Sequence, residues 1–97
     1  MSQVLYAITA HFRPGAEPTR QAIHEQYNEH LQQRHPHVRL AGPLRDEEGN
    51  RIGVLILLDA DDRAQAERFT QASPYTRADL YERVEIASLD IEVGSLG

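Results

Sequence analysis

The sequence predicts an α+β protein with one four-stranded antiparallel sheet and helices on one of its faces. Segments of strand and helix character follow one another in the order β-α-β-β-α-β, the order of the ferredoxin-like split βαβ fold. The two segments that this topology makes central, residues 3–12 and 51–60, carry apolar side chains on both faces. Pro43 lacks a backbone N–H, which favours an edge position or a β-bulge for the strand at residues 38–45.

The first half of the chain predicts a strand, a helix and a second strand. Residues 3–12 are rich in strand formers and alternate between two faces. The segment RPGAEP ends that strand, and Pro18 suits the first turn of a helix. We expect the helix to reach His35, because Pro36 disfavours helical geometry in the residue before it. One side of this helix carries Ile23, Tyr27, His30, Leu31 and Arg34.

The second half predicts a hairpin, a second helix and a last strand. DEEGN reads as the hairpin loop that leads into residues 51–60. The acidic start of DADDRAQAERFTQAS and the apolar Phe69 favour a helix that ends at Ser73-Pro74, followed by PYTRAD as a short turn or one helical turn. In LYERVEIASLDIEV the apolar phase slips, which predicts a β-bulge near Ile86 and Ala87.

The predicted sheet has one face that the helices do not cover. Its central strands are apolar on that side too, which leaves a surface too large for an ordinary monomer. We therefore expect a homodimer that packs open face against open face, with the C-terminal strand available to cross to the partner.

Composition limits the function. The 97 residues form one domain, 1–97, with a net charge of −5, so neither nucleic acid nor an anionic membrane is expected as a partner. Cysteine and lysine are both absent, which excludes thiolate and Schiff-base chemistry. The N-terminal segment lacks a basic region followed by a long apolar run, so we expect a cytoplasmic protein.

His30 is the first candidate for chemistry. Helical spacing puts it on the side of Ile23 and Tyr27, where lost solvation favours a neutral imidazole that can accept a proton. A core histidine with one hydrogen bond is the alternative, and spacing alone favours it.

A metal site is not expected. His35 and His37 lie near His30, but Pro36 separates them, and no carboxylate stands at a ligand spacing. Solvent-exposed loop positions explain His35 and His37 better than a metal site does. His11 and His24 stand alone and have no signal of their own, while turn chemistry and helix capping explain the clusters RDEEGNR and DADD.

Three segments in order along the chain resemble the YciI-like family: HL late in the first helix, RLAGPL in the second strand, and SPYTRADLYERVEI before the last strand. The resemblance spans nearly the whole chain. It implies a dimeric ferredoxin-like α+β barrel, related to muconolactone isomerase. It also implies an active site in a cleft, where a histidine of the first helix and an aspartate in an ADPY segment form a dyad.

The resemblance assigns candidate residues. It makes His30 the catalytic histidine, and Ser73 takes the place of the aspartate, because the chain reads ASPY. A hydroxyl can orient an imidazole but cannot stabilise its positive charge. Asp79 is a second candidate for the missing carboxylate. The flanking motif positions are Gly42, Pro43, Pro74 and Tyr75. Tyr75, Pro74 and Arg34 are the candidate substrate-binding residues, although Arg34 also suits a solvent-exposed helix end.

The resemblance implies acid/base chemistry without a cofactor, because one relative of the family is a dehydrochlorinase that acts on a chlorinated hydroxyhydroquinone. Proton abstraction, isomerisation or elimination on a small polar or aromatic molecule needs one placed base and a pocket that excludes water. The alternative is a non-catalytic protein, binding a small molecule or serving as an accessory subunit, that has lost the dyad. A cofactor-independent monooxygenase rests on fold analogy alone.

Overall fold

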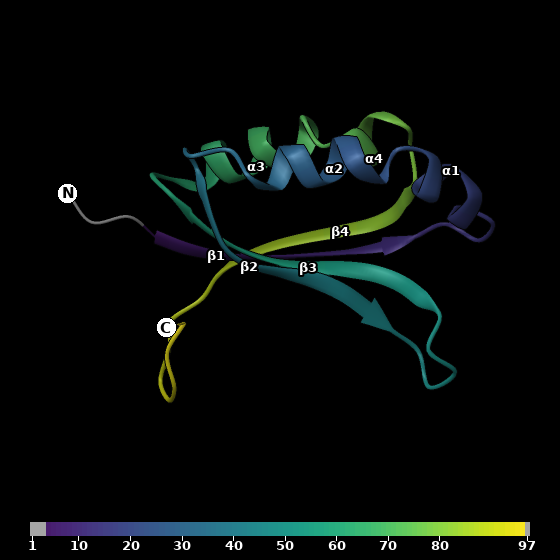
Figure 1. Cartoon of the computed structure of the whole chain (residues 1–97). Helices are drawn as coiled ribbons and strands as arrows, with labels where there is room; N and C mark the ends of the chain where they lie inside the picture. The colour runs from purple at the N-terminus through teal and green to yellow at the C-terminus, as the bar shows by residue number, and fades with distance from the viewer. Residues whose placement is uncertain (1–3, 97) are drawn as a thin grey trace.

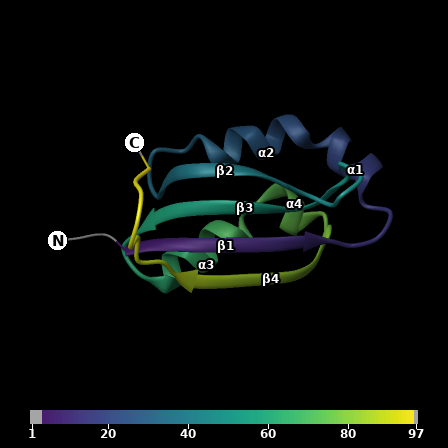
Figure 2. The ribbon, with the colours of Figure 1, turned by 90° about the horizontal axis from the view of Figure 1, so that it is seen from below.

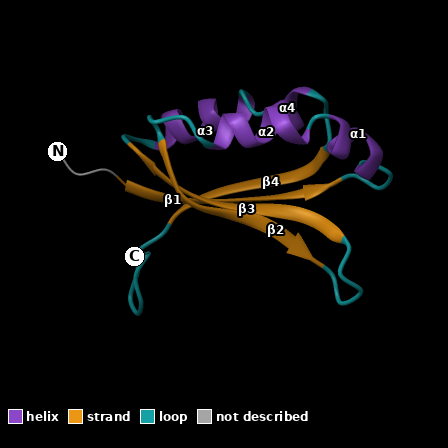
Figure 3. Ribbon diagram, viewed as in Figure 1, coloured by secondary structure: helices purple, strands orange, loops and turns teal. Residues whose placement is uncertain are grey.

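A computed structural model describes residues 4–96 as one antiparallel sheet in the order β2-β3-β1-β4, visible in Figure 2. The elements are β1 (Val4–Phe12), α1 (Glu17–Ala22), α2 (His24–Leu31), β2 (His37–Arg45), β3 (Arg51–Ala60), α3 (Arg63–Gln71), α4 (Pro74–Arg77) and β4 (Tyr81–Ser88). All four helices lie on one face of the sheet (Figures 1 and 3). The predicted α+β, ferredoxin-like fold is confirmed, with β1 and β3 central and the proline-bearing β2 at an edge.

The hydrophobic core lies between the helices and the sheet. Even-numbered residues of β1 face the helices, as the predicted alternation requires, and Ile8 is 1% exposed. Ile8, Leu58 and Tyr75 are the largest side chains that are fully buried. Loop 46–50 forms the predicted hairpin, and the Asp62 carboxylate caps α3 by accepting the N–H of Gln65 at 2.8 Å.

The first helix differs from the prediction because it is broken in two. Ile23 has φ −114° and closes α1, since its N–H bonds to the carbonyls of Thr19 and Arg20 at 3.2 and 3.3 Å. A second helix then starts at His24 and ends at Leu31, four residues before His35. The expectation of one helix to His35 was therefore wrong, although the contact between Arg20 and His24, four residues apart, crosses the break.

The last strand also differs. The pairing of β1 with β4 is regular from Tyr6 to His11, so the bulge predicted near Ile86 and Ala87 is wrong. The register shifts instead at the other end, between His11 and Phe12. The apolar phase slips because β4 ends at Ser88, and the residues that follow form a tail on the side of the sheet away from the helices (Figure 1).

The open face of the sheet is apolar in its centre. Ala7 pairs with Leu57 and Thr9 with Leu55, and these odd-numbered positions point away from the helices. Leu57 is 9% exposed yet stands outside the core cluster, whereas Leu40 on the edge strand is 45% exposed. Within residues 4–96 no helix has the length and apolar character needed to cross a membrane.

One glycine permits the close approach of the two central strands. A β-carbon at Gly53 would collide with the backbone carbonyl oxygen of Ala10 in β1. The same glycine lines the cavity described next, so the closely paired strands β1 and β3 form part of the cavity lining.

Candidate functional site

A cavity of about 150 Å³ lies between α2, α4 and the end of the sheet where β3 begins. A volume of about 150 Å³ holds one benzene-sized ring. The residues that line it are Phe12, His24, Tyr27, Asn28, Leu31, Ala41, Gly42, Pro43, Arg51, Gly53, Val54 and Tyr75. No carboxylate is among these lining residues.

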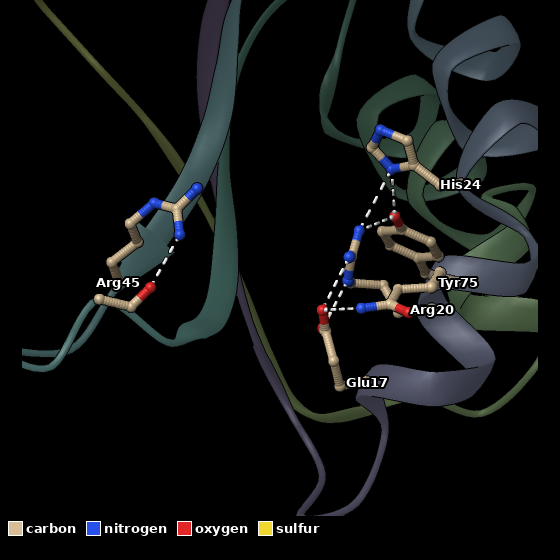
Figure 4. A network of polar contacts seen from close by, with 7 residues as sticks. Glu17, Arg20, His24, Arg45 and Tyr75 are labelled. Carbon is tan, nitrogen blue, oxygen red and sulfur yellow. Dashed lines mark hydrogen bonds and ion pairs between the residues drawn. The ribbon is translucent and has the colours of Figure 1, made fainter.

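His24 is the titratable group placed best for chemistry. It starts α2, and its Nδ1 lies 3.1 Å from the Tyr75 hydroxyl and 3.2 Å from Nη1 of Arg20. Figure 4 shows Arg20 between Glu17 on one side and the pair of His24 and Tyr75 on the other. A ring held at Nδ1 has a defined orientation and leaves Nε2 available for a proton transfer.

Arg20 is buried, 6% exposed, and Glu17 holds it there. The two side chains form a forked ion pair, with Nε to Oε1 at 2.6 Å and Nη2 to Oε2 at 2.8 Å. The Arg20 hydrogen bond is the main cause that lowers the pKa of Glu17 to about 2, and Glu17 in turn raises the pKa of Arg20. Glu17 therefore stays ionised and Arg20 stays fixed beside Tyr75.

Contacts on the two sides of the ring select opposite tautomers. Arg20 can only donate, so its contact with Nδ1 requires that this nitrogen be unprotonated, which places the proton on Nε2. The amide nitrogen of Asn28, which also lines the cavity, lies 3.3 Å from Nε2 and can only donate too, so this contact requires that Nε2 be unprotonated. The Tyr75 hydroxyl can donate to Nδ1 or accept from it, so either tautomer has a partner there.

The ring of Tyr75 connects the polar contacts of the site to the hydrophobic core. Its ring stacks on Tyr27 with centroids 3.9 Å apart and an interplanar angle of 8°, and Phe12 meets it edge-on at 5.6 Å. Burial raises the pKa of Tyr27 and of Tyr81, so both phenols stay neutral. Ser73 caps α4, because its hydroxyl accepts the N–H of Tyr75 at 3.2 Å.

The structure brings some predicted site residues together and leaves others apart. Tyr75, Gly42 and Pro43 line the cavity. Pro74 occupies the first turn of α4 and, like the exposed Arg34, is not among the lining residues.

The structure places Ser73, His30 and Asp79 in separate surroundings. Ser73 acts on the backbone of Tyr75, and no hydrogen bond joins it to His30 in the described chain. Asp79 forms an ion pair with Arg13 at 3.1 Å.

His30 is half-buried between α2 and α3. Its ring stacks on Phe69 with centroids 4.3 Å apart, and Nδ1 lies 3.3 Å from the amide nitrogen of Gln33. Nε2 is buried and has no hydrogen-bond partner among residues 4–96. Burial lowers the pKa of His30, and the nearby backbone of Phe69 only partly offsets this. The residue does not line the cavity.

The lowered pKa of His30 predicts an acid-sensitive fold. Well above pH 6.5, the ordinary pKa of histidine, the His30 ring is neutral in both the folded and the unfolded protein. As the pH falls below 6.5, the unfolded chain takes up the proton before the folded protein does. The free energy of unfolding should therefore fall as pH drops from 6.5 through the lower folded pKa. Urea unfolding across this pH range should show that the free energy of unfolding changes less steeply with pH in His30→Leu than in the wild type. The matched variant His37→Gln, at an exposed position, should keep the wild-type slope, and equal slopes in all three proteins would contradict the prediction.

The loop histidines do not assemble with other ligands. His35 contacts the carboxylate of Asp61 at 3.5 Å and the amide of Gln65 at 3.0 Å. Among the described residues no three of His, Cys, Asp or Glu lie where they could hold a metal ion.

Sequence reasoning missed His24, Arg20 and Asn28. These three residues are spaced by four, so in a helical segment they form one polar stripe. That spacing is the signal that could have found them. A single helix whose apolar side faces the sheet leaves this stripe as solvent-exposed surface.

Comparison with solved structures identifies proteins of similar fold. It is similar to a 5-chloro-2-hydroxyhydroquinone dehydrochlorinase from Burkholderia phenoliruptrix AC1100 in complex with 2,5-dihydroxybenzoquinone, with a TM-score of 0.80, 18% identity, and coverage of 89% of this chain and 93% of that one. An uncharacterized NIPSNAP domain protein from Burkholderia xenovorans matches with a TM-score of 0.56 and 20% identity over 91% and 93% of the two chains. At these identities the likeness concerns the fold.

Curated proteins supply no match to the chain. A family model describes it instead, and covers residues 4–90, from the first residue of β1 to two residues past β4. The chain therefore belongs to the family of the YCII-related domain.

Proposed function

We propose that the protein is an enzyme that performs acid/base chemistry on a small, single-ring molecule, with His24 as the proton-transferring group. The observation that carries this is the placement of His24: the Tyr75 hydroxyl and Arg20 hold its Nδ1, and the ring lines a cavity of about 150 Å³. A histidine that is oriented through one nitrogen and open to a cavity is the arrangement that general acid/base catalysis requires.

Tyr75 makes both directions of proton transfer possible. In the tautomer with the proton on Nδ1, that N–H donates to the Tyr75 hydroxyl and Nε2 can accept a proton from the ligand; in the tautomer with the proton on Nε2, Nδ1 accepts from the same hydroxyl and Nε2 can donate. Arg20 keeps Tyr75 in place, with Nη1 3.4 Å from its oxygen, and Glu17 fixes Arg20. Aromatic and aliphatic side chains make up much of the lining, which would limit the access of water to the transfer.

The dehydrochlorinase supports the reaction class. Its name describes elimination of HCl from a substituted hydroquinone, and its structure holds a planar, single-ring quinone. Removal of a proton followed by loss of a leaving group is an elimination. Removal of a proton followed by its return at another atom of the ligand is an isomerisation. Neither route needs more than one placed base and a dry cavity.

The experiment compares two histidines. His24→Gln should lower the turnover of small hydroxyquinones and cyclic enones by about a hundredfold to ten-thousandfold, the usual worth of a placed general base. His30→Gln should leave turnover near that of the wild type, because His30 packs on Phe69 outside the cavity. Thermal unfolding of each variant reports whether it folds. Loss of turnover in His30→Gln alone would support the role that the family resemblance implies for His30 and contradict the one proposed for His24.

A non-catalytic binding protein is the second candidate. The supporting observation is that Ser73 stands where the family resemblance places an aspartate, and no carboxylate lines the cavity. In that case small rings would raise the melting temperature of the wild type, while neither the wild type nor His24→Gln would convert them.

We also propose that two copies pack open face against open face. On that face Ala7 and Leu55 are partly exposed, Leu57 beside them is 9% exposed, and Leu40 at the edge is 45% exposed. A second copy offers the same apolar centre, so a two-fold arrangement satisfies both faces at once. The tail supplies Leu89, Ile91 and Val93, which are 37%, 48% and 94% exposed on the same side.

A further inference from the structure

Arg51 is the residue that the proposed acid/base chemistry leaves unexplained. It begins β3, lines the cavity, and is half-buried. It is the one arginine among the described lining residues, and no ion pair or side-chain hydrogen bond engages it within residues 4–96. A half-buried arginine without an ion pair or side-chain hydrogen bond loses solvation that no direct contact replaces.

The carboxylate of Glu17 does not neutralise Arg51. Glu17 feels its charge, which adds a minor contribution to the lowered pKa that the Arg20 hydrogen bond mainly causes. Both oxygens of Glu17 are already taken, by Arg20 at 2.6 and 2.8 Å and by Gln21 at 3.1 Å. Glu82 lines a neighbouring surface hollow with Arg51, without an ion pair. The positive charge at the cavity therefore stays uncompensated.

A second arginine increases the local positive charge. Arg45 is the register partner of Arg51 across the hairpin, and like charges opposite one another destabilise a sheet. Arg45 bonds to the carbonyl of Gly49 at 2.8 Å, which does not neutralise it (Figure 4). In a chain of net charge −5, this end of the cavity is a positive spot that would attract an anion.

We propose that the cavity binds single-ring oxyanions and that Arg51 binds the anionic oxygen. A guanidinium offers paired N–H donors that match a carboxylate or two neighbouring enolate oxygens. Apolar and aromatic lining residues such as Tyr27 and Val54 would contact the ring, and His24 lines the same space to transfer the proton. The inference rests on the proposed function only for the role of His24; the choice of an anion rests on Arg51.

The test is calorimetric titration of the intact protein with benzoate and benzamide, which share a ring and differ in charge. Wild type should bind benzoate at least about tenfold more tightly, the worth of one charge-assisted contact. Arg51→Gln should abolish this preference, and Arg51→Lys should keep part of it. Arg45→Gln removes the same charge from the facing strand position but not from the cavity lining, so it should weaken benzoate binding less than Arg51→Gln does and should keep the preference for benzoate over benzamide.

A second anion identifies the group that Arg51 prefers. Titration with 2,5-dihydroxybenzoquinone compares enolate oxygens with the carboxylate of benzoate; tighter binding of either supports an oxyanion site and names its class. The inference is overturned if Arg51→Gln binds benzoate as the wild type does, if benzamide binds as tightly as benzoate, or if neither anion binds.

His24→Gln separates this inference from the proposed function. The variant should keep the preference for benzoate over benzamide, because Arg51 is intact. Anion preference in a wild type that converts no substrate would leave the oxyanion site standing and the enzyme proposal refuted. Turnover that depends on His24 but not on Arg51, with no anion preference, would support the enzyme proposal and refute the oxyanion site.

Discussion

Replacement of Tyr75 by alanine is expected to lower the free energy of unfolding by about 3–5 kcal/mol, the usual cost of deleting a buried aromatic ring. The side chain is 1% exposed and stands among Tyr27, Phe12 and Tyr81. Its removal leaves a void and takes away the group that holds His24. Urea unfolding, followed by circular dichroism, measures the loss.

Tyr75→Phe is the matched control, because it keeps the ring and deletes only the hydroxyl. We expect a loss of about 1 kcal/mol, the net worth of a typical hydrogen bond. The same variant should alter the pH profile of turnover, because Nδ1 of His24 loses its neutral partner. If the alanine variant were as stable as the phenylalanine variant, the stacked ring would not belong to the core.

A charge on the open sheet face is expected to break the proposed dimer. Leu40→Glu places a carboxylate on that face beside Leu57, at a position that is 45% exposed in the single chain and that a second copy would cover. Light scattering coupled to size exclusion should give about twice the 11.0 kDa chain mass for the wild type and the single-chain mass for the variant.

Gln71→Glu is the control for added charge. It lies exposed at the end of α3, on the helical layer, so the proposed dimer should be unchanged. A wild-type protein that stays at 11.0 kDa at high concentration would refute the two-copy arrangement.

The sheet was predictable because strand patterns are local. Alternation in β1 and Pro43 in β2 indicate which strands are central and which lies at the edge, and the structure confirms both. The end of β4 was not predictable from alternation, since the apolar residues of the tail continue the pattern after pairing stops at Ser88.

The site was only partly predictable. Tyr75, Gly42 and Pro43 follow from motif resemblance and do line the cavity. His24 does not, because the helical stripe that it shares with Arg20 and Asn28 is polar and is typical of solvent-exposed surface. His30 lies on the stripe that the pattern favours, but it packs on Phe69 outside the cavity. The break at Ile23 accompanies contacts from distant parts of the chain, such as that between Arg20 and Tyr75, which no local pattern reports.

The two glycines that line the cavity tolerate change very differently. A β-carbon at Gly42 would meet nothing within 4 Å, whereas at Gly53 it would collide with the Ala10 carbonyl. A larger side chain at position 42 could therefore narrow the cavity and exclude bulkier rings without disturbing the pairing of the strands. Evolution or design can thus tune ligand size from the edge strand, while the wall formed by the central pair must keep its shape.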